Sequence, residues 1–552
     1  MTQLLLGGFL LSLKKARTEI LKIIGFTLLL AFFIALAGAN IYGQISNTGR
    51  KIAVDSAGNV YVTGSSANSE TFNDYDYATI KYDPAGNELW VARYNGPGDG
   101  PDVIYDLVID SFGNLYVTGF SRGVVVSNFA TIKYDSNGKE LWVARSNDNG
   151  YGMAVTLDSQ GNVYVAGYEK TDSIYFDYMV IKYDSAGNEL WVARYNGPAN
   201  LDDFANSIAV DSVGNVYVTG RSRNSLTIGD EDYATVKYDP NGNELWVVRY
   251  NGPGNLLDNA ISLAIDGLGN VCVTGQSRGI GTNGDIATIK YDPAGNELWV
   301  ARYNGTANGP DTAYDLVIDS LGNVYVTGSS SGGITSMDYV TIKYDPAGNE
   351  LWARRYTGLG GTGWMFWDVP RAIALDIGGN VYVTGPSVGS DIASDYATIK
   401  YDEDGNELWV ARYSRPGSHY GALDICVDGM GNVYVTGEST LQDDITCYAT
   451  IKYDSSGLEQ WVARYAFAGG MIASLIQHVQ AIDLQNAGGY SAKLEAAQDS
   501  YSKAVANDYA NTINQLEAFR LKCDNDPHLS DADRAALKNE ADTIINYLKS
   551  KI

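Results

Sequence analysis

The fifteen residues DPAGNELWVARYNGP, at positions 83–97, decide the fold of this 552-residue chain because the chain repeats them. The same stretch, with one substitution each time, returns at 184–198 and at 292–306. It alternates with a second phrase, GNVYVTG or a near variant, and each of the two signatures occurs eight times. A period of about fifty residues indicates a repeat architecture in which every copy forms one supersecondary unit.

Each copy predicts four β-strands, which in the first copy are Lys51–Asp55, Asn59–Gly64, Tyr77–Asp83 and Leu89–Tyr94. All four are rich in Val, Ile, Tyr and Trp, the residues that strands favour. Stretches such as DPAGN read as tight turns between strands, because Asp caps backbone N–H groups and Gly adopts the left-handed conformation. Since no stretch predicts a crossover helix within a copy, we expect antiparallel sheets.

A single sheet of this kind is not stable alone, because both of its faces carry large apolar side chains. In the fourth strand Leu89 and Val91 point to one face, whereas Trp90 and Tyr94 point to the other. Burying one Trp contributes on the order of 4–6 kcal/mol before entropy. Sheets that must be covered on both faces pack around an axis. The sequence therefore predicts an all-β propeller of eight four-stranded antiparallel blades, with seven blades and a displaced unit as the alternative.

The pattern D-x-x-G-N-V-Y-V-T-G followed by D-Y-x-T-I-K-Y-D resembles the bacterial SBBP β-propeller repeat and, more loosely, NHL-type blades. The resemblance covers about residues 45–465, three quarters of the chain. It implies a closed ring. The name of the SBBP family implies seven blades, whereas this sequence contains eight complete units.

Residues 1–44 predict an export segment. Four cations precede an apolar run from Ile23 to Leu36, and the small residues Ala37, Gly38 and Ala39 follow it. This pattern is typical of a cleaved signal peptide, and an uncleaved membrane anchor is the alternative. The formal charge of −26 repels phosphate backbones, so we expect no nucleic-acid partner.

Residues 466–552 differ from the repeats because apolar residues recur there at helical spacing. Four amphipathic helices of this size predict a small helical bundle. The segment resembles the FIMAH domain, a helical module attached to many bacterial adhesins and hydrolases. That resemblance implies an extracellular, multidomain context and no chemistry of its own.

The sequence predicts no catalytic residue and no cofactor, because its three histidines lack any nucleophile or metal-binding motif. Asp402, Asp404 and Asn406 alternate like the start of a calcium loop, but residue 413 is Tyr where such a loop closes with Glu. Turn capping is the favoured interpretation, and a weak calcium site is the alternative. Each copy also repeats a Lys and an Arg, Lys81 and Arg93 in the first, which we expect to contact aromatic rings or carboxylates.

A unique site is expected where the copies differ, in the loops that leave one rim of the ring. The loop at 357–370 carries Trp364, Met365, Phe366 and Trp367. We predict Trp364, Phe366 and Trp367 as binding residues, because exposed aromatic side chains stack on sugars or anchor proteins. The alternative is that they cover the axial channel or contact the helical bundle.

The leading functional interpretation is an exported, secreted or cell-surface binding or adhesion protein that recognises an extracellular protein or a carbohydrate. A membrane contact is expected only through an uncleaved N-terminal segment. One alternative is a polysaccharide-directed hydrolase or lyase that uses loop carboxylates such as Asp230, Glu231 and Asp232. The other alternative is a purely structural scaffold.

Overall fold

The structure is a computed structural model, and it falls into two compact units, residues 1–44 and residues 45–552. No described helix combines the length and the apolar character needed to cross a membrane. The predicted export segment lies outside the described residues. The described residues are 47–67, 75–146, 149–170, 174–227, 229–332, 336–359, 366–389, 393–414, 421–442, 445–466, 510–525, 529 and 531–549.

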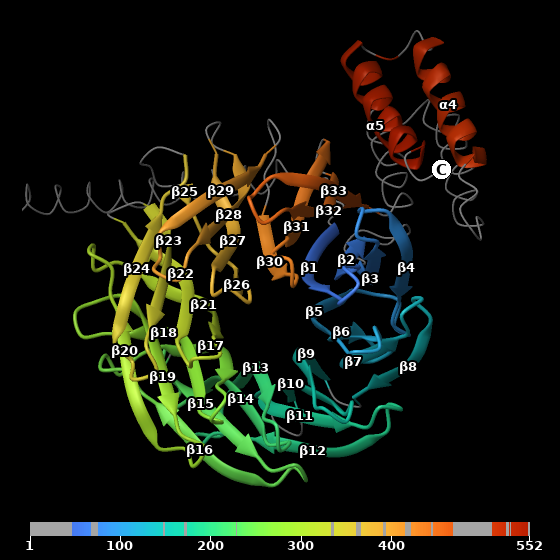
Figure 1. The fold of residues 1–552 in the computed structure, drawn as a ribbon. Coiled ribbons are helices and arrows are strands. Elements are labelled where there is room, and N and C mark those ends of the chain that lie inside the picture. Colours follow the sequence, from blue (N-terminus) through green and yellow to red (C-terminus); the bar gives the residue numbers. More distant parts are fainter. Residues whose placement is uncertain are drawn as a thin grey trace, which may run out of the picture. The chain divides into compact units, whose positions relative to one another are not determined.

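Eight antiparallel sheets stand around one axis, each built from four consecutive strands (Figure 1). The predicted propeller of eight blades is therefore confirmed, and the seven-blade alternative is wrong. The first blade consists of β1 (Asn47–Val54), β2 (Val60–Ala67), β3 (Tyr75–Tyr82) and β4 (Glu88–Tyr94); the second of β5 (Asp102–Ile109), β6 (Leu115–Arg122), β7 (Ser127–Tyr134) and β8 (Glu140–Arg145); the third of β9 (Asn149–Leu157), β10 (Val163–Lys170), β11 (Asp177–Tyr183) and β12 (Glu189–Tyr195); the fourth of β13 (Asp203–Val210), β14 (Val216–Arg223), β15 (Glu231–Tyr238) and β16 (Glu244–Tyr250).

The other four blades repeat this order, and the short strand β25 is an addition that pairs in parallel with β23. The fifth blade consists of β17 (Asp258–Ile265), β18 (Val271–Arg278), β19 (Gly284–Tyr291) and β20 (Glu297–Tyr303); the sixth of β21 (Asp311–Ile318), β22 (Val324–Ser331), β23 (Ser336–Tyr344) and β24 (Glu350–Tyr356), with β25 (Phe366–Trp367); the seventh of β26 (Ala372–Leu375), β27 (Val381–Val388), β28 (Ser394–Tyr401) and β29 (Glu407–Tyr413); the eighth of β30 (Gly421–Val427), β31 (Val433–Gln442), β32 (Ile445–Tyr453) and β33 (Glu459–Tyr465).

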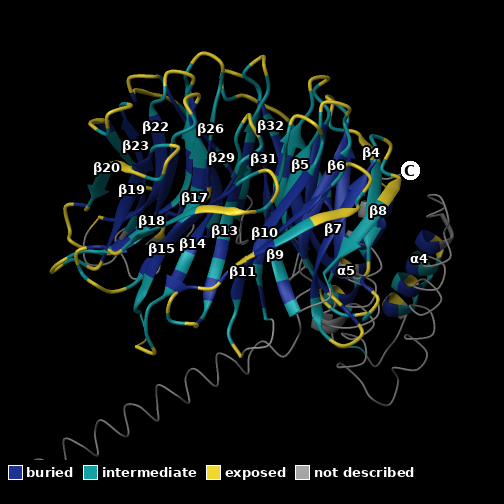
Figure 2. Cartoon of the chain, turned by 90° about the horizontal axis from the view of Figure 1, so that it is seen from below, coloured by how far each residue is buried: buried dark blue, intermediate teal, exposed yellow. Residues whose placement is uncertain are grey.

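The two rims of the ring differ in their connections. Turns of five residues join the first strand of a blade to the second and the third to the fourth, and they form what we call the constant face. Connections of unequal length, both shorter and longer than these turns, leave the opposite rim, the variable face. Seen from the side, exposed residues gather at these rims and buried residues fill the strands between them (Figure 2).

Tyrosines, rather than the expected tryptophans, fill the space between blades. The largest fully buried side chains are all Tyr, whereas Trp90 and most of its counterparts are only half-buried. The indole of Trp90 covers Gly138 in the next blade, where a Cβ atom would approach within 2.6 Å, and donates a hydrogen bond to Ser136 O at 3.2 Å. The Trp side chains therefore cover the outer edge of the contact between two blades, and the Tyr side chains form the centre of that contact.

The ring closes through side chains, because no strand is shared between the first and last blades. Asn47 of β1 donates a hydrogen bond from its backbone N to Thr446 Oγ1 at 2.7 Å. Tyr448 of the eighth blade donates its hydroxyl to Ala78 O of the first at 3.3 Å. The Tyr448 contact reproduces one found between consecutive blades, such as Tyr178 with Ala234 O at 3.2 Å.

Two helices are described after the propeller, α4 (Ala510–Asn525) and α5 (Asp531–Lys549). Leu516 and Phe519 of α4 and Leu537 and Ile544 of α5 are buried. Arg520 and Asp542 join the two helices in an ion pair at 2.5 Å. The first two predicted helices lie outside the described residues, so the four-helix bundle and the FIMAH-like character remain predictions.

Candidate functional site

A polar framework recurs from blade to blade and accounts for the repeated Lys and Arg. The ammonium of Lys81 lies 4.8 Å from the ring centre of Tyr61 and donates to Ser136 O of the next blade at 3.0 Å. Arg93 forms an ion pair with Asp76 at 2.8 Å. The structural interpretation of these cations is confirmed. Equivalent ion pairs are Arg249–Asp232, Arg302–Asp285, Arg355–Asp338 and Arg412–Asp395.

The loop carboxylates proposed for a hydrolase are divided between structural roles. Asp232 belongs to the framework, since it pairs with Arg249 at 3.3 Å. Asp230 accepts a hydrogen bond from the hydroxyl of Ser225. Glu231 lies half-buried at the start of β15. Two of these three carboxylates therefore stabilise their own loop and blade.

The candidate calcium residues form a turn. Asp402 accepts hydrogen bonds from the backbone N of Asp404 at 3.0 Å and of Asn406 at 2.7 Å. The Asn406 amide also donates to Asp402 at 2.8 Å. These hydrogen bonds are those of a capped turn, and the weak calcium site stays a prediction. Within the described ranges, no three His, Cys, Asp or Glu side chains cluster as metal ligands would.

The aromatic loop before the seventh blade is described only in part. Trp364 and Met365 lie outside the described residues, and the position of Phe366 is known only through its backbone in β25. Trp367 is 62% exposed, and its neighbour Asp368 is buried, accepting a hydrogen bond from Val388 N at 2.9 Å. Trp367 therefore remains a candidate contact residue on a fixed backbone.

A β-bulge interrupts the innermost strand of seven blades at the same place. Because a bulge leaves one residue without a partner across the sheet, it re-aims that side chain. These strands surround the axis (Figure 1), and the bulge residue differs between nearly all of the blades. The bulge residues are Arg50, Tyr105, Met153, Asn206, Ile261, Tyr314 and Leu423.

In four blades the residue directly after the bulge residue is charged and lies near the axis. Lys51 Nζ lies 4.0 Å from the carboxylate of Asp106. The carboxylates of Asp424, Asp106 and Asp315, in that order of influence, raise the pKa of Lys51. Burial raises the pKa of Asp315 to about 6, and Lys51 opposes this rise. Asp424 also accepts a hydrogen bond from Ile52 N at 2.9 Å. One cation thus stands among three carboxylates from different blades.

Six half-buried aromatic rings lie in continuous contact near the variable end of the axis. They belong to the second, third and fourth blades, and we call them the aromatic strip. Successive ring centres are 6.3 Å (Tyr105–Phe120), 5.0 Å (Phe120–Tyr151), 5.2 Å (Tyr151–Tyr168) and 4.8 Å (Tyr168–Phe204) apart, and Phe176 lies 5.3 Å from Tyr168.

Three cations lie over rings of this strip, and we call them the mouth cations. Arg50 lies 5.4 Å from the ring centre of Tyr105, Lys170 lies 4.7 Å from that of Phe176, and Arg221 lies 4.7 Å from that of Phe204. Unlike Arg93, none of the three has a carboxylate within 4.0 Å among the described residues. The Nε of Arg50 is buried and donates no hydrogen bond to any described residue. The strip and the mouth cations form the candidate site.

Sequence reasoning missed this site, although a signal for it was present. The residue after VTG, or after VAG, is Phe120, Tyr168 or Arg221 in three successive copies, whereas the other five copies have Ser65, Gln276, Ser329, Pro386 and Glu438. Comparison of the copies position by position finds these substitutions. Only the packing of neighbouring blades in the propeller, however, places these residues beside Phe176 and Phe204.

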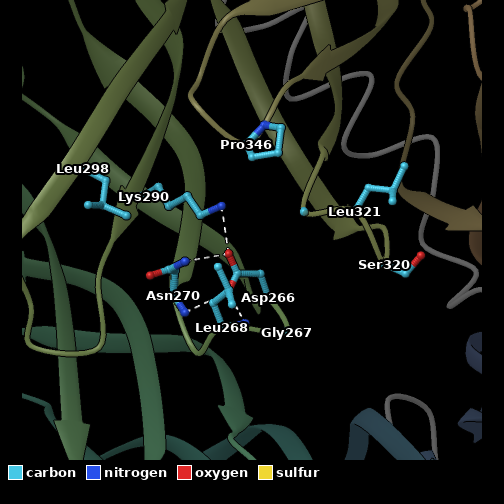
Figure 3. A pocket seen from close by; sticks show the side chains of 10 residues that line it. Asp266, Gly267, Leu268, Asn270, Lys290, Leu298, Ser320, Leu321 and Pro346 are labelled. Carbon is cyan, nitrogen blue, oxygen red and sulfur yellow. Dashed lines mark hydrogen bonds and ion pairs between the residues drawn. The ribbon is translucent and has the colours of Figure 1, made fainter.

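A pocket of about 450 Å³ opens between the fifth and sixth blades on the constant face (Figure 3). In the other seven blades a Tyr hydroxyl reaches the turn carboxylate, as Tyr325 reaches Asp319 at 3.2 Å. The fifth blade has the buried Cys272 in place of this Tyr. Lys290 instead forms a buried ion pair with Asp266 at 2.9 Å.

Replacing Cys272 by Tyr is expected to raise the free energy of unfolding by about 1–2 kcal/mol, since the residue shared by the other copies restores a ring and a hydrogen bond. The hydroxyl would meet Asp266, and Lys290 would lie over the ring as Lys237 lies over Tyr217. Urea denaturation of C272Y beside C272V measures the effect. A less stable C272Y protein would show that the pocket does not correspond to the missing ring.

Comparison with known proteins agrees with this architecture. Residues 34–69, 190–226 and 299–334 match the family described as beta-propeller repeat (SBBP). The chain is a β-propeller repeat protein. Among curated proteins, the propeller is similar to the uncharacterized WD repeat-containing protein L264 of Acanthamoeba polyphaga mimivirus, with 25% identity over 78% of this chain and 38% of the relative. It therefore spans well under half of that relative's length.

Solved structures also resemble the propeller. Sqt1 of Chaetomium thermophilum, bound to the N-terminus of the ribosomal protein L10, has 12% identity and a TM-score of 0.47, covering 75% of this chain and 98% of Sqt1. A protein of unknown function from Bacteroides caccae has 12% identity and a TM-score of 0.31, covering 53% of this chain and 93% of its own.

Proposed function

We propose that the protein is an exported binding scaffold that recognises a partner through the variable face of its propeller, at the cell surface or outside the cell. One observation carries the proposal. The contacts between blades repeat around the ring, whereas the continuous aromatic strip, among the described residues, lies on one arc of it. Outside this arc one cation lies over a bulge tyrosine, Arg371 at 5.3 Å from the ring centre of Tyr314, and no strip of rings is described beside it. A feature that stability needs recurs in every blade, so a strip of rings confined to one arc favours recognition.

Half-exposed aromatic rings beside cations have the composition of binding hot spots. Tyr and Arg are enriched among the residues that dominate binding energy, because they combine large apolar area with a polar group. Tyr105, Tyr151 and Tyr168 are all half-buried, so part of each ring is accessible. Trp367, at 62% exposure, supplies a second aromatic contact.

The constant face offers a competing surface that the experiment has to exclude. Its turns expose apolar side chains, including Phe112 at 83%, Leu321 at 77% and Met430 at 77%. Screening the full chain against glycan and peptide arrays identifies a ligand without assuming which face binds it. The variants Tyr168→Ala and Leu321→Ala then assign the ligand to a face.

The Tyr168→Ala protein is expected to bind about thirtyfold more weakly, the loss typical of a hot spot of about 2 kcal/mol. The Leu321→Ala protein is expected to stay within about twofold of the wild type, because Leu321 lies in a turn of the constant face. Trp367→Ala tests the second contact region in the same assay. Loss of binding in Leu321→Ala alone would contradict a variable-face site.

The export part of the proposal rests on the cations, apolar run and small residues of the N-terminal 44 residues. Fractionation of cells that express the full chain, followed by N-terminal sequencing, tests it. Recovery outside the cytoplasm, with a new N-terminus at Asn40 or with the segment retained in the membrane, is expected. Recovery in the cytoplasm with an intact N-terminus would exclude export.

A further inference from the structure

We infer that the aromatic strip and the mouth cations bind an acidic peptide segment, in which carboxylate side chains flank apolar ones. This inference rests on the proposed function and names its partner. The chain carries a formal charge of −26, with 65 acidic and 39 basic residues. Most cations of such an acidic protein can pair with its own carboxylates. Cations without a carboxylate within 4.0 Å therefore indicate a binding site for an anion of another molecule.

The contrast with the framework arginines makes the charge argument specific. Arg302 and Asp285 pair at 2.8 Å, and Arg412 and Asp395 pair at 2.9 Å. These pairs neutralise the cations inside each blade. Arg50, Lys170 and Arg221 contact aromatic rings instead, and a ring face attracts a cation without cancelling its charge.

Three carboxylates near the strip or the mouth cations contact other groups. Glu169 pairs with Arg194 at 2.6 Å. Asp202 accepts a hydrogen bond from Phe176 N at 3.1 Å. Glu438 accepts a hydrogen bond from the Thr48 hydroxyl at 3.2 Å. Glu438 interacts with Arg50 at longer range, but no described carboxylate lies within 4.0 Å of a mouth cation, so a ligand carboxylate adds a closer partner.

The arrangement along the strip matches a short extended chain. Arg50 contacts Tyr105 at one end of the strip, and Arg221 contacts Phe204 at the other. Lys170 contacts Phe176 beside the second end. A ligand that spans the strip thus meets aromatic rings in its middle and cations at both ends, which favours apolar residues flanked by acidic ones.

The geometry of the rings favours a peptide over an acidic sugar. Sugars stack on open aromatic faces, but Tyr105, Phe176 and Phe204 each have a cation over one face. Tyr151 and Tyr168 stack on each other with an interplanar angle of 28°. Their accessible parts are better suited to apolar side chains, which pack against ring edges without a required orientation.

Selection of a random twelve-residue peptide-display library on the full chain tests the inference. We expect the enriched peptides to combine Glu or Asp with apolar residues. Fluorescence anisotropy then measures the affinity of one enriched peptide for the wild type, for R50Q/K170Q/R221Q, and for K139Q. Lys139 lies exposed in a turn of the constant face and serves as the matched control.

The triple variant is expected to bind at least about a hundredfold more weakly, because it removes three charge-assisted contacts. The K139Q protein is expected to stay within about twofold of the wild type, since exposed charges beyond a Debye length are screened. The single charge reversal Lys170→Glu, with its thermal unfolding measured in parallel, separates lost binding from lost folding. It is expected to weaken binding more than tenfold with little change in unfolding temperature.

Enrichment of neutral or basic peptides, or equal binding by the triple variant, would overturn the inference. If such peptides still lose affinity in Tyr168→Ala, the variable face binds peptides and the proposed function survives. Binding of oligogalacturonate in place of peptides, lost in the triple variant, would assign the strip to acidic sugars and also overturn the inference. Absence of binding by peptides and glycans alike would remove both proposals.

Discussion

Replacing Tyr448 by Ala is expected to lower the free energy of unfolding by about 3–5 kcal/mol, the cost of removing a large buried aromatic side chain. Tyr448 is fully buried, its ring centre lies 5.3 Å from that of Tyr465, and its hydroxyl donates to Ala78 O of the first blade at 3.3 Å. The side chain therefore stabilises the junction that closes the ring. Urea denaturation monitored by tryptophan fluorescence measures the loss.

Two further variants separate the parts of this effect. Tyr448→Phe keeps the ring and is expected to cost about 1 kcal/mol, the value of one hydrogen bond. Leu458→Ala changes a side chain of the same blade that is 65% exposed, and is expected to cost less than about 0.5 kcal/mol. If Tyr448→Ala costs no more than Leu458→Ala, the first and eighth blades do not close a ring.

Replacing Lys51 by Met is expected to lower the free energy of unfolding by about 2 kcal/mol at neutral pH. Removing one partner of a fully buried ion pair costs about 3–5 kcal/mol. The Lys51 side chain is 40% exposed, however, so solvent screening reduces that cost. The loss arises because Asp106, Asp315 and Asp424 then face one another without a cation.

The cost of Lys51→Met is expected to depend on pH with a definite sign. Burial raises the folded-state pKa of the axial carboxyls above the unfolded values, to about 6 for Asp315. The folded state therefore takes up protons more readily, and repulsion among the carboxylates is relieved as the pH falls through about 6.

Measuring the free energy of unfolding at about pH 8 and about pH 5 tests this sign. The difference between Lys51→Met and the wild type should be smaller at the lower pH. Adding Asp315→Asn to Lys51→Met should recover part of the loss at the higher pH. An equal loss at both pH values would show that the carboxylates do not interact at the axis.

The blades could be predicted from the sequence because their signals are local. Alternation in ELWVARY indicates a strand, and Asp and Gly in DPAGN indicate a turn, whatever the rest of the chain does. The number of blades followed from counting copies. The predicted first strand began at Lys51, whereas β1 begins at Asn47, because residues before the bulge also pair with β2.

The core and the candidate site could be predicted only in part, because both depend on contacts between copies. Alternation placed Trp90 on a buried face, but only the packing of neighbouring blades shows that Tyr61 lies deeper than Trp90. Phe120 and Tyr151 belong to different blades, so the 5.0 Å between their ring centres depends on how neighbouring blades pack in the propeller. Trp367 was predicted because its loop is unusual within a single copy.

Hydrogen–deuterium exchange of the full chain, with and without an enriched acidic peptide, tests the central claim most directly. The claim predicts slower exchange at the variable ends of β5, β6, β9, β10 and β13, where the aromatic strip lies, and unchanged exchange in the constant-face turns. Protection confined to constant-face turns, such as those at 266–270 and 319–323, would contradict it and move the binding surface to the opposite rim.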